Sequence, residues 1–165
     1  MKKNFHKKNR LENYDYSSDG IYFLTVCTEQ RKWLLSRIVA RGIPDAPATE
    51  LTSNGEAAKD AIAFLDKNWD CLSILKFVIM PNHIHLLVRV WGASGMPRAT
   101  DAVIPKFVSA LKRYTNRQCG QQLWQKSYYD HVIRDETDYL TKATYIENNA
   151  AKWAEDEYFV VGDCL

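Results

Sequence analysis

The stretch VIMPNHIHLLV, residues 78–88, predicts the hairpin at the centre of a β-sheet. Aliphatic and β-branched residues stand on both sides of a Met-Pro-Asn corner, which is typical of two antiparallel strands joined by a tight connection. Side chains alternate faces along a strand, so the second strand has two different faces. They are His83, His85, Leu87 and Arg89 on one side and Ile84, Leu86, Val88 and Val90 on the other. The wholly aliphatic face is expected to pack on helices, which leaves both histidines on the opposite face of the sheet.

Further elements follow from residue type and periodicity on either side of this hairpin. We expect strands at residues 20–28 (GIYFLTVCT), 71–80 (CLSILKFVIM) and 123–135 (LWQKSYYDHVIRD). We expect helices at residues 56–68, 104–111 and 137–153, with Thr52 or Asn54 as the cap of the first. Residues 41–55 contain Pro, Gly and Thr and predict an exposed loop, part of which could be a short hairpin or turn.

This order of strand, helix, strand, strand, helix, strand, helix predicts an α+β fold, a ferredoxin-like or RRM-like sandwich. We expect one central antiparallel sheet with its helices segregated to one side. The 165 residues suffice for one core, so residues 19–165 are expected to form a single domain. Residues 1–18 begin with MKKNFHKKNR and are expected to form a basic flexible arm, which could contact phosphates or remain a solvated tail.

Charge and cysteine content restrict the function only loosely. A net charge of +2 neither requires nor excludes a nucleic-acid partner. The four cysteines stand singly, with no C-x-x-C pair and no secretory signal, so neither a zinc knuckle nor a disulfide framework is indicated. No apolar run approaches the roughly 18 residues of a membrane span. We therefore expect a reduced, cytoplasmic protein without a membrane partner.

The histidine pair permits two interpretations. His83 and His85 are two residues apart on one face of a strand, so they can converge on one metal ion. Two polar residues on a solvated sheet face would give the same pattern. If a metal binds, its remaining ligand is expected from another element, such as a helix laid over the histidine face.

The last predicted helix could provide that ligand. Its apolar stripe consists of Tyr139, Ala143, Ile146, Ala150 and Trp153. Tyr145 and Asn149 are four residues apart and lie beside the stripe, near Lys142 and Lys152, a grouping that suits phosphoryl transfer. Alternatively, Tyr145 is an ordinary amphipathic residue at the rim of the core.

A second tyrosine has the same spacing on the preceding helix. Tyr114 and Gln118 are also four residues apart, but Tyr114 continues an apolar stripe. That stripe consists of Val103, Phe107, Ala110, Leu111 and Tyr114. Tyr114 is therefore expected to be a packing residue.

Together, the histidine strand and the tyrosine helix resemble the single-tyrosine HUH transposases of the IS200-like family. MPNHIHLLV resembles their His-hydrophobic-His motif, and TYIENNAAK resembles the helix that bears their catalytic tyrosine. LWQKSYYDHVIRDETDYL resembles the segment before that helix in the REP-associated tyrosine transposases (RAYT). The likeness runs from about residue 20 to residue 153, nearly the whole chain.

The resemblance implies a metal-dependent endonuclease and strand transferase acting on single-stranded DNA beside a hairpin. By position, His83, His85 and Asn149 would be ligands of Mg²⁺ or Mn²⁺, and Tyr145 would be the nucleophile that forms a 5′-phosphotyrosine link. The family also implies a nucleoid-associated protein that is either a monomer or a homodimer. His131 and Arg134 lie in a family-like stretch but receive no catalytic role.

Two other functions remain open. The same fold could bind hairpin DNA or RNA without chemistry, or it could be a metal-dependent phosphoesterase that uses water. The complete set of His83, His85, Tyr145 and Asn149 favours the transposase, because a binding module has no need of a nucleophile beside a metal.

Overall fold

A four-stranded antiparallel sheet forms the centre of the molecule. The computed structural model describes residues 19–39, 47–91 and 103–159. The strands are β1 (Gly20–Cys27), β4 (Leu72–Ile79), β5 (His83–Val90) and β6 (Tyr129–Val132), and their order across the sheet is β4-β5-β1-β6. The predicted arm at residues 1–18 lies outside the described residues, as does part of the predicted domain.

The strand order confirms the predicted fold class. Helix α1 (Ser53–Asn68) connects β1 to β4, and helix α2 (Val103–Cys119) connects β5 to β6. A split pair of βαβ units with this antiparallel order is the ferredoxin-like arrangement. The Met-Pro-Asn corner joins β4 to β5 as expected, and the Met80 N–H closes it with a 2.9 Å bond to the His83 carbonyl.

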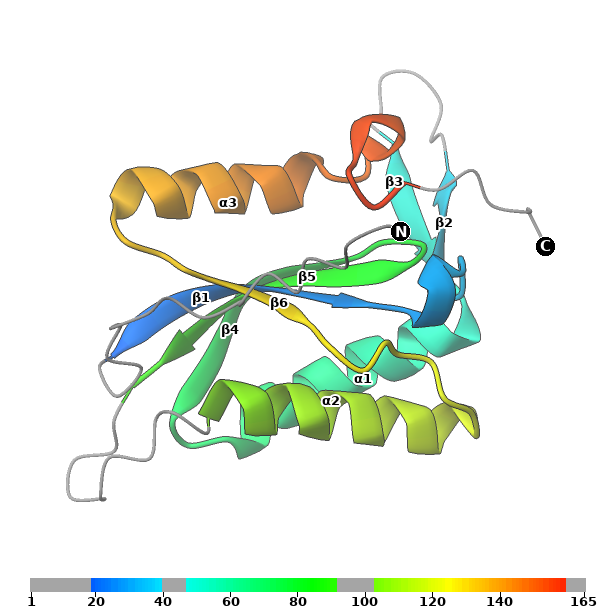
Figure 1. Cartoon of the computed structure of the whole chain (residues 1–165), viewed down its shortest axis with the longest axis horizontal. Helices are drawn as coiled ribbons and strands as arrows, with labels where there is room; N and C mark the ends of the chain where they lie inside the picture. The colour runs from blue at the N-terminus through cyan, green and yellow to red at the C-terminus, as the bar shows by residue number, and fades with distance from the viewer. Residues whose placement is uncertain (1–18, 40–46, 92–102, 160–165) are drawn as a thin grey trace, which may run out of the picture.

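Helices cover both faces of the sheet, so the predicted segregation of all helices to one side is wrong. Helices α1 and α2 lie on one face, and α3 (Glu136–Asn148) lies on the other (Figure 1). The aliphatic face of β5 packs under α1 and α2 as predicted, with Ile84, Leu86 and Val88 fully buried. On the opposite face, Ala143 and Ile146 of α3 pack against Phe23 and Leu87 in a smaller cluster. The amphipathic stripe of α3 is what holds it over the histidine face.

The predicted loop at residues 41–55 contains ordered structure at its C-terminal end. Strands β2 (Ser36–Val39) and β3 (Ala48–Leu51) pair in a separate two-stranded sheet, while residues 40–46 lie outside the described residues. Helix α1 begins at Ser53, and the Thr52 hydroxyl accepts a bond from the Gly55 N–H. The N-cap therefore belongs to Thr52 rather than Asn54, and the helix starts one turn earlier than the apolar periodicity indicates.

The last two predicted elements are shorter than expected. The predicted strand at residues 123–135 is regular only at Tyr129–Val132, together with an isolated bridge between Trp124 and Thr28. Helix α3 ends at Asn148 rather than Trp153, and a 3-10 turn (Trp153–Glu155) follows it. This turn redirects the chain back over the histidine face. Within the described segments, no helix is long and apolar enough to cross a membrane.

Candidate metal and nucleophile site

His83 and His85 are buried side by side at the start of β5. Their exposed fractions are 0% and 1%, so the interpretation of a solvated polar pair is wrong. The two Nε2 atoms are 2.9 Å apart, and the ring centroids are 4.3 Å apart. Both side chains point to the face covered by α3, as strand alternation predicts.

The Asn82 side chain fixes the tautomer of His83. Its Nδ2 donates to the carbonyl oxygens of Arg31, at 3.3 Å, and Tyr158, at 2.8 Å. This orientation turns the Asn82 Oδ1 towards the His83 Nδ1, 2.8 Å away. An amide oxygen only accepts, so Nδ1 bears the proton and the Nε2 lone pair of His83 faces His85.

His85 is held from the neighbouring strand β1. The Thr25 Oγ1 lies 2.9 Å from the His85 Nδ1, and both groups are buried. The Phe23 ring stacks on the His85 ring with centroids 5.0 Å apart. Because the Thr25 hydroxyl is the partner of Nδ1, the His85 Nε2–H donates to the His83 Nε2, and a bound ion would take the place of that proton.

Both histidines are neutral at physiological pH. Burial lowers the pKa of His83 to about 4; the Asp156 carboxylate opposes this shift and Arg31 adds to it. Burial likewise holds the pKa of His85 well below its usual value, and the neighbouring His83 and Lys142 act in the same direction. Neutral imidazoles with inward-facing Nε2 atoms are the form that binds metal ions.

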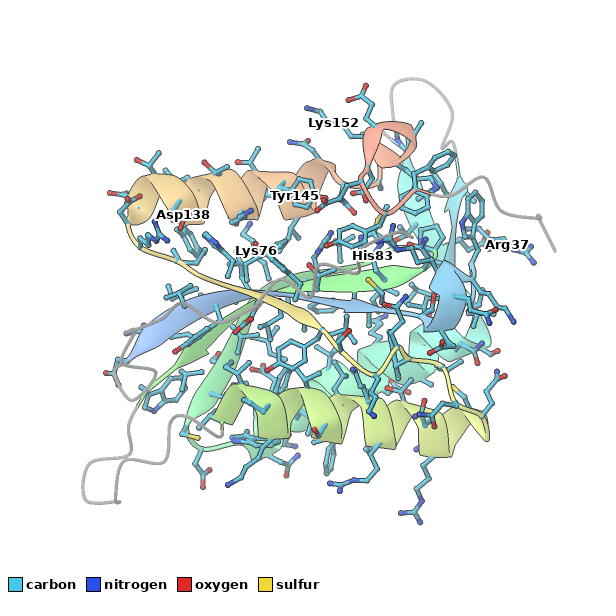
Figure 2. The ribbon with its side chains drawn as sticks, viewed as in Figure 1. Arg37, Lys76, His83, Asp138, Tyr145 and Lys152 are labelled. Carbon is cyan, nitrogen blue, oxygen red and sulfur yellow. The ribbon has the colours of Figure 1, made fainter. Side chains whose placement is uncertain are left out.

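Tyr145 and Asn149 reach this site from α3, and one carboxylate holds both of them. The Tyr145 hydroxyl and the Asn149 Nδ2 each donate a 2.7 Å bond to the same oxygen, Oδ2 of Asp156. The Tyr145 ring centroid is 5.1 Å from that of His85. Figure 2 shows Tyr145 extending from α3 towards the sheet, on the side where His83 lies. The structure therefore brings all four predicted site residues together.

The orientation of Asn149 leaves one polar atom without a partner. Its Nδ2 points at Asp156, while its Oδ1 is buried and has no hydrogen-bond partner among the described residues. Asn149 is 2% exposed, and its contact with His83 favours the protonated form of that ring. An orphaned buried carbonyl is costly, so its presence beside the His83 imidazole indicates a position for a ligand.

Tyr145 is a protonated phenol at neutral pH. Burial raises its pKa above the usual value, and the hydrogen bond to Asp156 and the charge of that carboxylate raise it further. Any attack by this oxygen therefore requires positive charge nearby and an acceptor for its proton.

Asp156 and Tyr158 are site residues that the sequence reasoning missed. Asp156 contributes an oxygen to a group of possible ligand atoms, with His83 and His85, that all lie within 4.8 Å of one another. The Tyr158 ring lies over the histidines, with centroids 4.7 Å from His83 and 5.7 Å from His85. In the sequence, both residues stand in the acidic segment WAEDEYF, which has no periodicity that could place them.

A pocket of about 380 Å³ opens beside the tyrosine. It is lined by Thr141, Thr144, Tyr145, Asn148, Asn149, Lys152, Glu155 and Asp156. Lys152 is thus near the tyrosine as predicted, and the Lys142 ammonium lies 4.8 Å from the centre of the Phe23 ring, whose own centroid is 6.1 Å from that of Tyr145. Tyr114 packs against the α1–α2 core on the other face of the sheet, as expected.

The two family-like residues before α3 have structural contacts. His131 Nε2 lies 2.9 Å from an Asp138 oxygen, and the Arg134 backbone N–H donates to the same carboxylate at 3.1 Å. Both contacts join β6 to the start of α3.

Comparisons with known proteins identify the family. The family described as IS200-like transposases matches residues 18–149. An uncharacterized protein of Haemophilus influenzae is 29% identical over 175 residues, which cover 94% of each protein. The REP-associated tyrosine transposase of Escherichia coli is 25% identical over 138 residues, 83% of this chain and 70% of that protein.

A solved structure shares the fold. It is a REP-associated tyrosine transposase bound to a REP hairpin, with a TM-score of 0.63 and 21% identity over 90% of this chain and 76% of that one. Since the family match covers most of the sequence, the chain belongs to the IS200-like transposase family. The predicted family is thereby confirmed, and REP-associated tyrosine transposases are among the similar proteins, as expected. DNA binding and recombination follow from the family.

Proposed function

We propose that this transposase is a metal-dependent endonuclease and strand transferase for single-stranded DNA. The observation that supports this most strongly is the convergence of a buried histidine pair, Asn149 and the Tyr145 hydroxyl around the single carboxylate of Asp156. Burying so many polar groups in one place costs free energy unless they hydrogen-bond to one another or bind a common ligand.

The donor set fits a divalent ion. His83 and His85 offer neutral Nε2 atoms 2.9 Å apart, close to the roughly 3 Å expected between adjacent ligands at ~2.1 Å from one ion. The orphaned Asn149 Oδ1 offers an oxygen. Two imidazoles beside an oxygen donor favour Mn²⁺ over Mg²⁺, because Mg²⁺ prefers a shell of oxygen atoms. When bound, such an ion supplies Lewis-acid stabilisation of the charge that grows on the scissile phosphate.

Tyr145 is the proposed nucleophile. A bond forms between its phenolic oxygen and the phosphorus, and the bond from phosphorus to the preceding 3′ oxygen breaks. The products are a 5′-phosphotyrosine and a free 3′-hydroxyl. The hydroxyl proton of Tyr145 already points at Asp156, 2.7 Å away, so an acceptor for it is in place. Since the phosphotyrosine conserves the energy of the phosphodiester, rejoining to another strand needs no nucleotide cofactor.

A DNA hairpin beside the cleavage site is the proposed recognition element. The support is the related transposase whose solved structure contains a REP hairpin. In this chain, the 380 Å³ pocket beside Tyr145 offers the space for the scissile nucleotide, with Lys152 on its wall as a phosphate contact.

The test is an adduct assay with hairpin-bearing single-stranded DNA and Mn²⁺. We expect a covalent protein–DNA product on denaturing gels, lost in Tyr145→Phe and retained in the matched control Tyr114→Phe, whose ring lies on the opposite face. An adduct that survives Tyr145→Phe but not Tyr114→Phe would show that the nucleophile is assigned wrongly.

The same assay separates the two alternative functions. Cleavage without an adduct, lost in His83→Ala but not in Tyr145→Phe, would indicate a phosphoesterase that uses water. Salt-sensitive hairpin binding that EDTA leaves unchanged, with no cleavage under any metal, would indicate a binding module.

A further inference from the structure

Asp156 lies at the centre of the site, although it follows the 3-10 turn and belongs to neither the histidine strand β5 nor the tyrosine helix α3. One of its oxygens accepts bonds from Tyr145 and Asn149, and the other accepts a 2.7 Å bond from the Tyr158 N–H. Three donors from α3 and the segment after it therefore fix this carboxylate. The bond from the Tyr158 N–H is a local Asx turn, whereas the bonds from Tyr145 and Asn149 tie the carboxylate to α3 and its C-cap and so set its position in the site.

The carboxylate also faces the histidines. A ligand atom from each of His83, His85 and Asp156 lies within 4.8 Å of the other two. Without Asp156, the side chains that could hold an ion would be two neutral imidazoles and one neutral carboxamide. Mg²⁺ and Mn²⁺ prefer oxygen donors, and affinity at such sites rises with ligand charge.

We infer that Asp156 is the negatively charged ligand that completes the metal site of His83, His85 and Asn149. The inference rests on the proposed function, because it concerns the same ion. It assigns the only carboxylate in this cluster of possible ligands among the described residues.

Mn²⁺ binding to the full chain without DNA tests the inference, by calorimetry or by the electron paramagnetic resonance signal of free Mn²⁺. We expect Asp156→Asn to raise the Kd at least tenfold, because the amide keeps an oxygen but loses the charge. The matched control is Glu157→Gln, which removes the same charge from an exposed neighbour, and it should change the Kd less than twofold.

His83→Gln separates failure of the inference from failure of the proposed function. If His83→Gln weakens Mn²⁺ binding and Asp156→Asn does not, the role of Asp156 is refuted while the metal site stands. If the wild-type chain binds no Mn²⁺, the proposed metal-dependent function and this inference both fall.

A second measurement does not depend on a folded Asp156→Asn variant. Infrared difference spectra of the wild-type chain labelled with ¹³C-aspartate should show a carboxylate stretch that shifts when Mg²⁺ is added. This band should lose its isotope shift in Asp156→Glu, whose carboxylate is unlabelled. A spectrum that Mg²⁺ leaves unchanged would overturn the inference.

Discussion

The Asn82 Oδ1 lies 2.8 Å from the His83 Nδ1, and two backbone carbonyls on its other side determine which way the carboxamide faces. The corner of the central hairpin therefore does more than reverse the chain. It selects the tautomer that presents the His83 Nε2 to the site, a role that outer hydrogen bonds commonly have around metal-binding histidines.

Replacing Asn82 should weaken metal binding and stability together. We expect Asn82→Ala to raise the Kd for Mn²⁺ by about 10–100-fold, because His83 loses its orienting acceptor. It should also lower the free energy of unfolding by about 1–3 kcal/mol, because buried carbonyls lose their donor. Titration with Mn²⁺ and urea denaturation measure the two effects.

Asn82→Asp serves as the matched variant. It keeps an acceptor for the His83 Nδ1 but loses the donor to Arg31 and Tyr158. We expect it to bind Mn²⁺ more tightly than Asn82→Ala while remaining less stable than the wild type. Equal Mn²⁺ affinity in both variants would argue against the tautomer role.

Thr25 should affect the site through its hydroxyl, which lies against His85 and also contacts the Tyr158 side chain. Thr25→Val keeps the shape of the side chain but removes the hydroxyl 2.9 Å from the His85 Nδ1, so we expect a several-fold weaker Mn²⁺ affinity. Thr115→Val is the control, since Thr115 is equally buried but bonds the Leu111 carbonyl within α2. Loss of Mn²⁺ binding in Thr115→Val as well would point to a general packing effect rather than to His85.

The metal-free protein should become less stable as the pH falls below about 6.5. Burial lowers the pKa of His83 to about 4 and lowers that of His85, whereas histidine in the unfolded chain titrates near ~6.5. Between these values the unfolded state binds more protons than the native state, so acid favours unfolding. The stability is fully present above the unfolded pKa and is lost as the pH falls towards 4.

Urea denaturation in EDTA across this pH range measures the effect. We expect a loss on the order of 1–3 kcal/mol from His83. His83→Gln should flatten the pH dependence between pH 6.5 and 4. An unchanged slope in that variant would mean that other groups control the acid sensitivity.

Gly55 should be intolerant of a side chain. A Cβ at this position would lie 2.0 Å from the Leu35 carbonyl oxygen and 3.2 Å from the Leu51 Cβ, so α1 would have to move away from the strands beside it. We expect Gly55→Ala to destabilise the fold by about 2–3 kcal/mol or more in urea.

Gly120→Ala provides the contrast for this packing effect. Nothing lies within 4 Å of its added Cβ, but its φ of +64° is left-handed. We expect a cost of about 1 kcal/mol, from backbone strain alone. If Gly55→Ala also lowers the free energy of unfolding by only about 1 kcal/mol, α1 moves away from the Leu35 carbonyl more easily than the 2.0 Å distance indicates.

Local periodicity determined much of this protein from the sequence. The alternation along residues 83–90 places His83 and His85 opposite the aliphatic face, and the structure has that arrangement. The helical spacing of Tyr145 and Asn149 survives because Asn149 keeps helical backbone angles at the end of α3. Such features depend on neighbours within one turn or one strand, so the order of residues is enough to predict them.

Only the tertiary structure placed the helix and the carboxylate that complete the site. α3 covers the face opposite α1 and α2 because Phe23 and Leu87 offer it a second apolar patch, and no single segment reveals that patch. Asp156 reaches Tyr145 and Asn149 because the helix ends early and a 3-10 turn brings the chain back.

Asn82 illustrates the same division between sequence and structure. Its role depends on carbonyls 51 and 76 residues away in the chain. The sequence thus determined the histidines, the tyrosine and the faces they occupy. Folding decided which oxygen atoms surround them, because hydrogen bonds between distant segments depend on where each chain turn ends rather than on a local repeat.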